Sequence, residues 1–71
     1  MRAIVNLDIT RNGEVVLTQN QEVQVVEVLG DVTFPEVSGS LVTVVDNNSL
    51  EVYVKTSDIT AYDRDGNVVA L

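Results

Sequence analysis

Hydrophobic residues in this chain recur at every second position rather than at the three- and four-residue spacing of a helix. Within residues 4–10, Val5, Leu7 and Ile9 share one face, and the polar Asn6 and Asp8 point the other way, as a strand with one buried face requires. Further valine-rich runs end at Val45 and at Val54, and β-branched residues favour strands. The period predicts an all-β fold.

Turn residues separate these runs and indicate how the strands connect. Asn12-Gly13 is typical of a tight hairpin turn, because both residues tolerate a positive φ. Asp46-Asn47-Asn48-Ser49 predicts a second hairpin, and Asp65-Gly66-Asn67 a reversal before the last apolar residues. Ser38-Gly39-Ser40 has the same turn chemistry, and Thr56-Ser57-Asp58 predicts the chain's one short helical turn.

The apolar period slips once, in the segment that begins at Glu22. Val23 and Val25 share one phase, whereas Val26 and Val28 continue in the opposite phase. A slip of this kind predicts a β-bulge or bend, with which small barrels turn a corner. We expect this strand to end at Gly30-Asp31. The following residues 32–37 are the least periodic and contain a proline, so they predict a loop or an edge.

A chain of 71 residues and 7.7 kDa is too short for two hydrophobic cores, so residues 1–71 are expected to form a single domain. Five to seven short antiparallel strands must close on themselves or pair with another chain, because an open sheet leaves unpaired edges. The sequence therefore favours a small β-barrel with at most one short helical turn.

The order of these segments resembles bacterial Src-homology-3-like domains. The features that carry the resemblance are a long first excursion, the strand Glu22-Val23-Gln24-Val25-Val26, a hairpin from Leu41 to Val54, and Leu50-Glu51-Val52-Tyr53-Val54 followed by Thr56-Ser57-Asp58-Ile59. The resemblance covers residues 1–62 and implies a Src-homology-3-like small barrel. Members that bind proline-rich peptides share a cluster of aromatic residues, whereas this chain has one Phe, two Tyr and no Trp, so polyproline recognition is not carried over.

Several classes of chemistry are excluded by composition. The chain has neither Cys nor His, which removes thiol nucleophiles, imidazole acid–base catalysis, disulfides and ordinary zinc sites. The turn at Asp63–Asn67 lacks the glycine position and the distal carboxylate of an EF-hand loop. The remaining carboxylates are dispersed, as on a solubilising surface. We therefore expect no enzymatic activity, no cofactor and no metal.

The net charge of −7, from eleven acids and four bases, restricts the partners. Dispersed bases do not form the patch that a nucleic acid or an anionic membrane requires. The acidic field favours a protein partner with a basic or mixed surface. The first residues do not resemble a signal peptide and no long apolar run follows, so we expect a soluble cytoplasmic protein that starts at its own methionine.

The candidate partner-binding residues are the large rigid side chains and one acid beside them: Phe34, Pro35, Tyr53, Tyr62 and Glu51. Aromatic residues dominate the energetics of interfaces. Tyr53 has the opposite phase to its buried neighbours and points outward, whereas Phe34 either closes one end of the core or joins the interface. The apolar residues 68–71 either form a final strand or offer an edge to a second copy.

These features predict a non-enzymatic protein-interaction module, of the kind that small prokaryotic or phage accessory proteins use to modulate a larger protein. Two alternatives remain open. One is a structural or assembly protein that forms homo-oligomers or part of a virion-like particle. The other is an acidic nucleic-acid mimic whose carboxylates occupy the basic groove of a DNA-binding protein.

Overall fold

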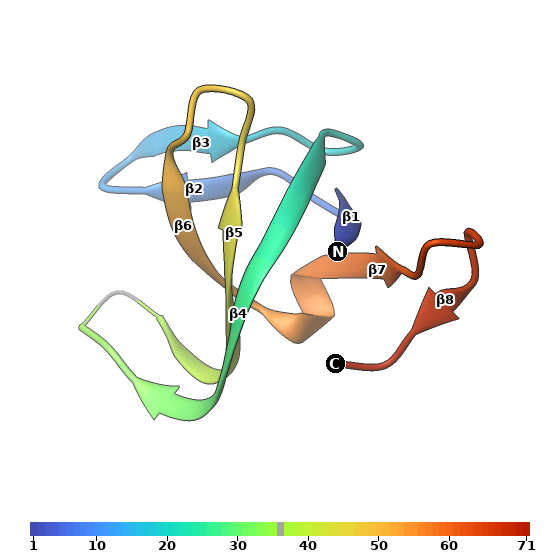
Figure 1. Ribbon diagram of the computed structural model, residues 1–71. Coiled ribbons are helices and arrows are strands. Elements are labelled where there is room, and N and C mark those ends of the chain that lie inside the picture. The colour runs from blue at the N-terminus through green and yellow to red at the C-terminus, as the bar shows by residue number, and fades with distance from the viewer. Residues whose placement is uncertain (36) are drawn as a thin grey trace.

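The computed structural model describes residues 1–35 and 37–71, and its regular elements are strands apart from one 3-10 turn (Figure 1). In chain order these are β1 (Arg2–Val5), β2 (Ile9–Arg11), β3 (Glu14–Leu17), β4 (Glu22–Thr33), β5 (Ser38–Val45), β6 (Glu51–Lys55), the 3-10 turn η1 (Thr56–Asp58), β7 (Ile59–Tyr62) and β8 (Val68–Val69). The all-β class and the helical turn are confirmed. No helix in the described residues is long and apolar enough to cross a membrane.

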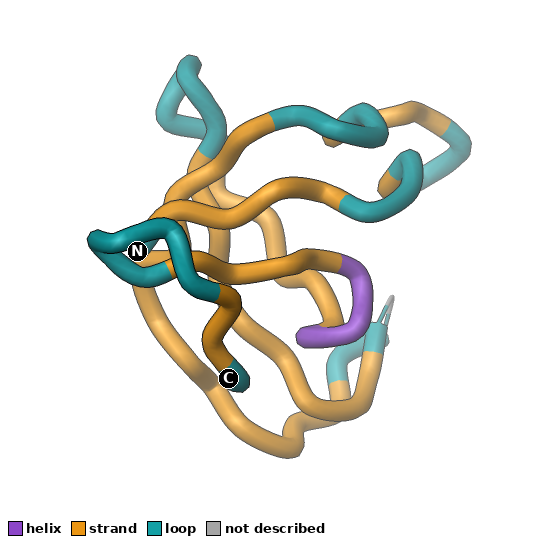
Figure 2. Tube along the Cα trace, turned by 90° about the vertical axis from the view of Figure 1, so that its right-hand side faces the viewer, coloured by secondary structure: helices purple, strands orange, loops and turns teal. Residues whose placement is uncertain are grey.

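The strands form two open antiparallel sheets. Six strands pair in the order β6-β5-β4-β1-β7-β8, and β2 pairs with β3 alone. Figure 2 shows that the larger sheet is strongly curved, so that its strands wrap around a common interior. The pairing does not join the two outermost strands, and closure into a barrel is not confirmed by it. The described residues form eight strands instead of the expected five to seven, because the strand predicted over residues 4–10 is divided into β1 and β2.

The core lies on the concave side of this sheet and is built mostly from valine. On β5 and β6 the period of two places alternate residues inward, and Val42, Val44 and Val54 are fully buried. Val52 of β6 joins them, and the rest of the core comes from the other strands, at Ala3, Val5, Ile9, Leu17, Val23, Ile59 and Ala61. The outward-facing residues of β6, Glu51, Tyr53 and Lys55, are exposed and therefore available for other contacts, whereas on β5 Leu41 and Thr43 are buried as well.

The alternation predicted through residues 4–10 is wrong at Leu7, which is 47% exposed. The chain leaves the sheet at Asn6, whose amide donates to the carbonyl of Asp58 at 2.8 Å. This contact ends β1 and bends the chain, so Ile9 enters the core from the separate strand β2. The Asn12-Gly13 turn of that hairpin is confirmed, with φ values of 54° and 81°.

The phase slip predicted near Val26 is confirmed as a bulge in β4. The register with β5 shifts between Val25 and Glu27 and again between Val28 and Gly30. Gly30 has φ of +77°, a conformation that a side chain would strain. The long strand pairs with β1 at its start and with β5 along the rest of its length, so the bulges lie where it changes direction.

The predicted strand end at Gly30-Asp31 and the predicted turn at Ser38-Gly39-Ser40 are both wrong. The strand β4 continues to Thr33, and Ser38–Ser40 form the start of β5, with Val32 opposite Gly39. Because the β4–β5 ladder continues to the pair of Thr33 and Ser38, the chain reverses between these two residues. The amide of Phe34 donates to the carbonyl of Val37 there, at 2.9 Å. Glu36, in the segment predicted to be irregular, lies outside the described residues.

Candidate functional site

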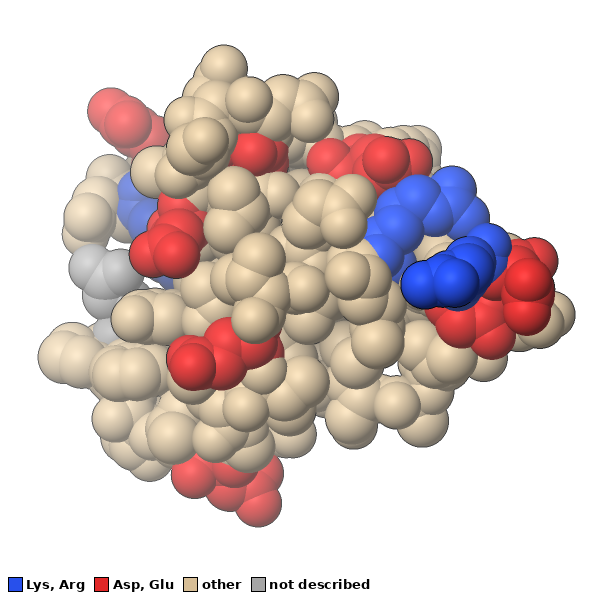
Figure 3. Space-filling view, in the orientation of Figure 1, with Lys and Arg blue, Asp and Glu red and all other residues tan. Residues whose placement is uncertain are grey.

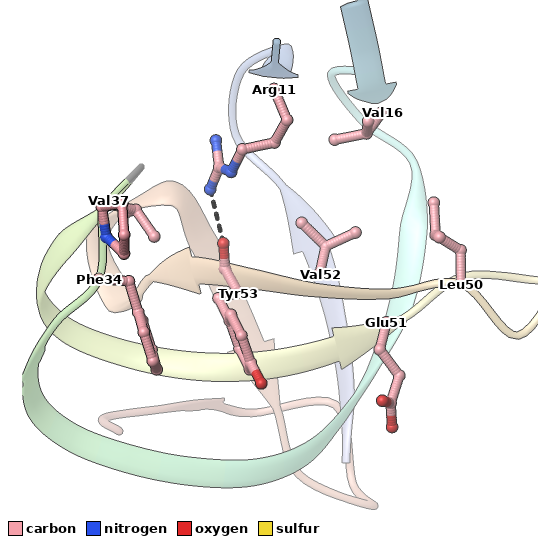
Figure 4. Close-up of a pocket in the computed structure, with 9 residues that line it drawn as sticks. Arg11, Val16, Phe34, Val37, Leu50, Glu51, Val52 and Tyr53 are labelled. Atoms are coloured by element: carbon pink, nitrogen blue, oxygen red, sulfur yellow. Dashed lines mark hydrogen bonds between the residues drawn. The ribbon is translucent and has the colours of Figure 1, made fainter.

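A groove runs along the free edge of β6, between the β2–β3 hairpin and the turn that joins β4 to β5 (Figure 4). Its cavity volume is about 410 Å³. Most of the residues that line it are apolar, and they are Arg11, Val16, Phe34, Pro35, Val37, Leu50, Glu51, Val52 and Tyr53. Such an apolar concavity, with a few polar groups at its border, is the usual form of a binding site.

Two aromatic rings stack at one side of the groove, below β6 in the view of Figure 4. The centroids of Phe34 and Tyr53 are 4.8 Å apart, with an interplanar angle of 9°. Tyr53 points outward because its neighbours Val52 and Val54 face the core, and Phe34 reaches it from the β4–β5 turn. Both rings remain exposed, Tyr53 at 46% and Phe34 at 36%. Phe34 therefore does not close the core, and belongs to the surface instead.

The backbone of Tyr53 is also turned toward the groove. The amide of Asp46 donates to the carbonyl of Leu50 at 3.1 Å, so these two residues form a hydrogen-bonded pair at the end of the β5–β6 ladder. In an antiparallel ladder, hydrogen-bonded and non-hydrogen-bonded pairs alternate. Counting along the register from this pair, Tyr53 and Thr43 form a non-hydrogen-bonded pair. Its carbonyl faces away from β5 and accepts from Arg11 Nη2 at 2.6 Å. Arg11 also donates to its neighbouring carbonyl, that of Thr10, at 2.7 Å. The hairpin is thereby attached to the edge of β6.

The β5–β6 turn fixes the other end of the groove. Asp46 Oδ1 accepts from the amides of Asn48 and Leu50, at 2.8 and 2.9 Å. Leu50 precedes β6 and is 47% exposed, whereas Val52, two residues further along, is buried. In Figure 4, Leu50 and Val52 lie on one side of β6, while Glu51, Tyr53 and Phe34 lie on the other.

The structure brings four of the five predicted site residues together: Phe34, Pro35, Tyr53 and Glu51 line the groove. The fifth, Tyr62, lies on β7, which β5, β4 and β1 separate from β6 in the sheet order. Its ring lies under the Arg2 guanidinium, whose Cζ is 5.0 Å from the ring centroid. Arg2 in turn forms an ion pair with Glu22 at 3.6 Å.

Sequence reasoning missed Arg11, Val16, Leu50 and Val52 as groove residues. The sequence carries no signal for Arg11, because its role depends on the hairpin reaching β6, 42 residues further along the chain. Leu50 could have been found from its place directly after the polar turn. A large apolar side chain at this place precedes the strand, and it stays exposed although it lies on the same side of β6 as Val52.

The Asp63–Asn67 turn uses its carboxylate internally. Asp63 Oδ1 accepts from the amides of Asp65 and Asn67, both at 2.9 Å. The hydrogen bond from the Asn67 amide is the main reason that the pKa of Asp63 is lowered, since it stabilises the ionised form. In the described residues no group of three or more acidic side chains is placed to hold a metal ion.

Acidic side chains are scattered over the visible face in Figure 3, and a group of basic side chains lies toward the side of β7 and β8. Among the described residues, Arg2 and Glu22 form the one ion pair. The groove thus lies in a surface whose negative charge is mostly uncompensated, in keeping with the net charge of −7.

Comparison of the chain with models of known protein families, with curated proteins and with solved structures finds no match.

Proposed function

We propose that the protein is a non-enzymatic interaction module that binds a segment of a protein partner in the groove along β6. The observation that carries this proposal is the exposed stack of Phe34 and Tyr53 beside an apolar concavity. Rigid aromatic side chains bury a large area at a small cost in conformational entropy, and they are enriched among the residues that dominate binding energy.

A Src-homology-3-like barrel is the arrangement that we propose for the two open sheets. Three features support it. The strand β1 pairs with both β4 and β7, β4 to β6 follow one another as a meander, and η1 stands directly before β7. The bulged strand β4, shared between β1 and β5, gives the bend that such a barrel needs at a corner. In this arrangement the β2–β3 hairpin forms one wall of the groove.

Selection from a random peptide library displayed on phage tests the function. We expect the protein to enrich peptides with apolar residues, and calorimetry on a selected peptide to show that Phe34→Ala weakens binding by about 2 kcal/mol, roughly 30-fold. The matched control is Val68→Ala, because Val68 is also apolar and exposed but lies on β8. Circular dichroism would verify that both variants fold.

The proposal fails if no peptide is enriched, or if Phe34→Ala binds the selected peptide as the wild-type protein does. Ionic strength separates it from nucleic-acid mimicry. Apolar contacts are little affected by salt, whereas binding held by exposed carboxylates weakens steeply as screening increases. A selected ligand that DNA displaces would favour the mimic.

A further inference from the structure

A second, smaller pocket adjoins the groove on the convex side of the sheet. It has a volume of about 330 Å³ and is lined by Val26, Glu27, Thr43, Glu51 and Tyr53. Glu51 and Tyr53 line the groove as well, and Figure 4 shows both side chains pointing to the same side of β6. A ligand in the groove can therefore extend into this pocket without leaving the surface.

The bulge in β4 builds one wall of the pocket. Val25 stands opposite Val44 and Glu27 stands opposite Thr43, so Val26 is the extra residue between two pairs of the ladder. In a bulge the two residues that oppose one partner turn toward the same face of the sheet. This places Val26, which is 54% exposed, beside Glu27 on the convex side.

Three strands bring a carboxylate, a hydroxyl and an aromatic ring into one row. Glu27 is opposite Thr43, and Thr43 is opposite Tyr53, at the usual strand spacing of about 4.8 Å. Glu51, two residues before Tyr53, adds a second carboxylate to the same face. Among the described residues neither Glu27 nor Glu51 forms an ion pair, and Lys55 lines a different pocket, on the Phe34 side.

The floor of the pocket holds a polar group that the fold does not use. Thr43 is only 5% exposed, and in the described part of the chain its hydroxyl oxygen has no hydrogen-bond partner. Buried hydroxyl groups are nearly always bonded, because leaving one unsatisfied costs about 1–3 kcal/mol. Its neighbours Val42 and Val44 face the core, so Thr43 faces the pocket. The hydroxyl oxygen is covered by neighbouring atoms, so an incoming donor reaches it only when the side chains around it move aside.

We infer that this pocket receives a lysine or arginine side chain of the protein segment that occupies the groove. The inference rests on the proposed function and names the chemistry of the partner. The alkyl stem of such a side chain packs on Val26, and its cationic head faces the carboxylates of Glu27 and Glu51. The ring of Tyr53 adds a cation–π contact, and Thr43 accepts a hydrogen bond. A metal ion does not fit, because no group of three acidic side chains is placed to hold one in the described residues.

The composition of the selected peptides tests this inference. We expect peptides that bind the wild-type protein to contain Lys or Arg beside their apolar residues, and selection on Glu27→Gln to lose this enrichment while the apolar residues remain. Replacing the basic residue of one selected peptide by norleucine is expected to weaken binding about fivefold to tenfold. The same replacement should have a smaller effect on Glu27→Gln, since only the carboxylate of Glu51 then remains to face the cation.

The charge-matched control is Asp65→Asn, which removes one negative charge in the β7–β8 turn, remote from β6 in the sheet order. It should retain the preference for basic peptides, whereas a general effect of net charge would reduce it equally. Selected peptides that are apolar but not enriched in Lys or Arg would overturn this inference and leave the groove proposal standing. Failure to select any peptide would overturn both.

Discussion

The two tyrosines of this chain occupy opposite situations. Tyr62 lies under the Arg2 guanidinium, and Arg2 is itself paired with Glu22, so three strands satisfy one another within the chain. Tyr53 stacks only on the exposed ring of Phe34, and the pocket beside it contains two carboxylates without a cation among the described residues. The ring of Tyr62 has a cation over it, whereas no basic residue in the described part of the chain lines the pocket beside Tyr53.

The difference teaches that an exposed aromatic residue is informative through its surroundings rather than its type. The β7 region also satisfies its polar groups internally: Thr60 donates its hydroxyl to Asn6 Oδ1 at 2.9 Å. In the β5–β6 region the corresponding hydroxyl, that of Thr43, has no partner in the described residues. This contrast supports the proposal of a binding surface at β6 rather than at β7.

The largest expected effect separates the two tyrosines by binding. Tyr53→Ala removes the ring shared by the groove and the smaller pocket, and should weaken a selected peptide by 2 kcal/mol or more, about 30-fold. Tyr62→Ala removes a ring that contacts Arg2 instead, so the affinity should stay within about twofold, the scatter expected for a site without contact. Calorimetry on both variants measures this, and equal losses would show that the two regions do not differ.

The next effect concerns stability and uses the two threonines. Thr43→Val keeps the shape of the side chain and removes the unsatisfied hydroxyl, so we expect stabilisation by about 1 kcal/mol. In a chain of this size that raises the melting temperature by about 4–8 °C. Thr60→Val, the same change where the hydroxyl has a partner, should lower it.

Differential scanning calorimetry of both threonine variants provides the measurement. A decrease for Thr43→Val would mean that its hydroxyl is satisfied in solution, and the contrast between the two regions would then disappear. If instead the variant is more stable and its peptides lose their basic residues, the hydroxyl serves the partner at the expense of the fold.

Much of the fold could be predicted from the sequence, because strand alternation and turn chemistry are local. The Asn12-Gly13 hairpin and the bulge at Val26 follow from residues within one or two positions. The errors arise where a distant contact decides. The contact between Asn6 and Asp58 exposes Leu7, and the continuing β4–β5 ladder extends Ser38-Gly39-Ser40 into a strand.

The candidate site was predictable in its residue types but not in its grouping. Tyr53 was identified as a large, rigid side chain out of phase with the core, whereas for Phe34 a place in the core and a place in the interface both stayed open. Tyr62 was grouped with them because the sequence does not reveal that β1 lies between β4 and β7. The role of Thr43 could not be foreseen either, since a threonine within a valine-rich strand is ordinary until its neighbours on both adjacent strands are known.

The smallest effect is expected on the stability of the fold in acid, and it concerns only the turn between β7 and β8. The amide of Asn67 donates to Asp63 and lowers the pKa of its carboxyl below the usual value of 3.8. Because this pKa is lower in the folded than in the unfolded chain, the ionised carboxylate stabilises the fold above pH 3.8, and this contribution is lost as the pH falls through the folded pKa. Asp63→Asn, which has no charge to lose, should therefore approach the wild-type stability as the pH is lowered.

Hydrogen exchange followed by NMR at several acidic pH values localises this effect. As Asp63 is protonated, the amides of Val68 and Val69 should lose protection first, because their two-residue strand β8 directly follows that turn and pairs with β7 alone. The amides of β6 should keep their protection, since the turn that precedes them depends on Asp46 instead. Simultaneous opening of β6 and β8 would mean that the two regions unfold as one unit, and that the independence of the Tyr53 surface from the Tyr62 surface does not extend to stability.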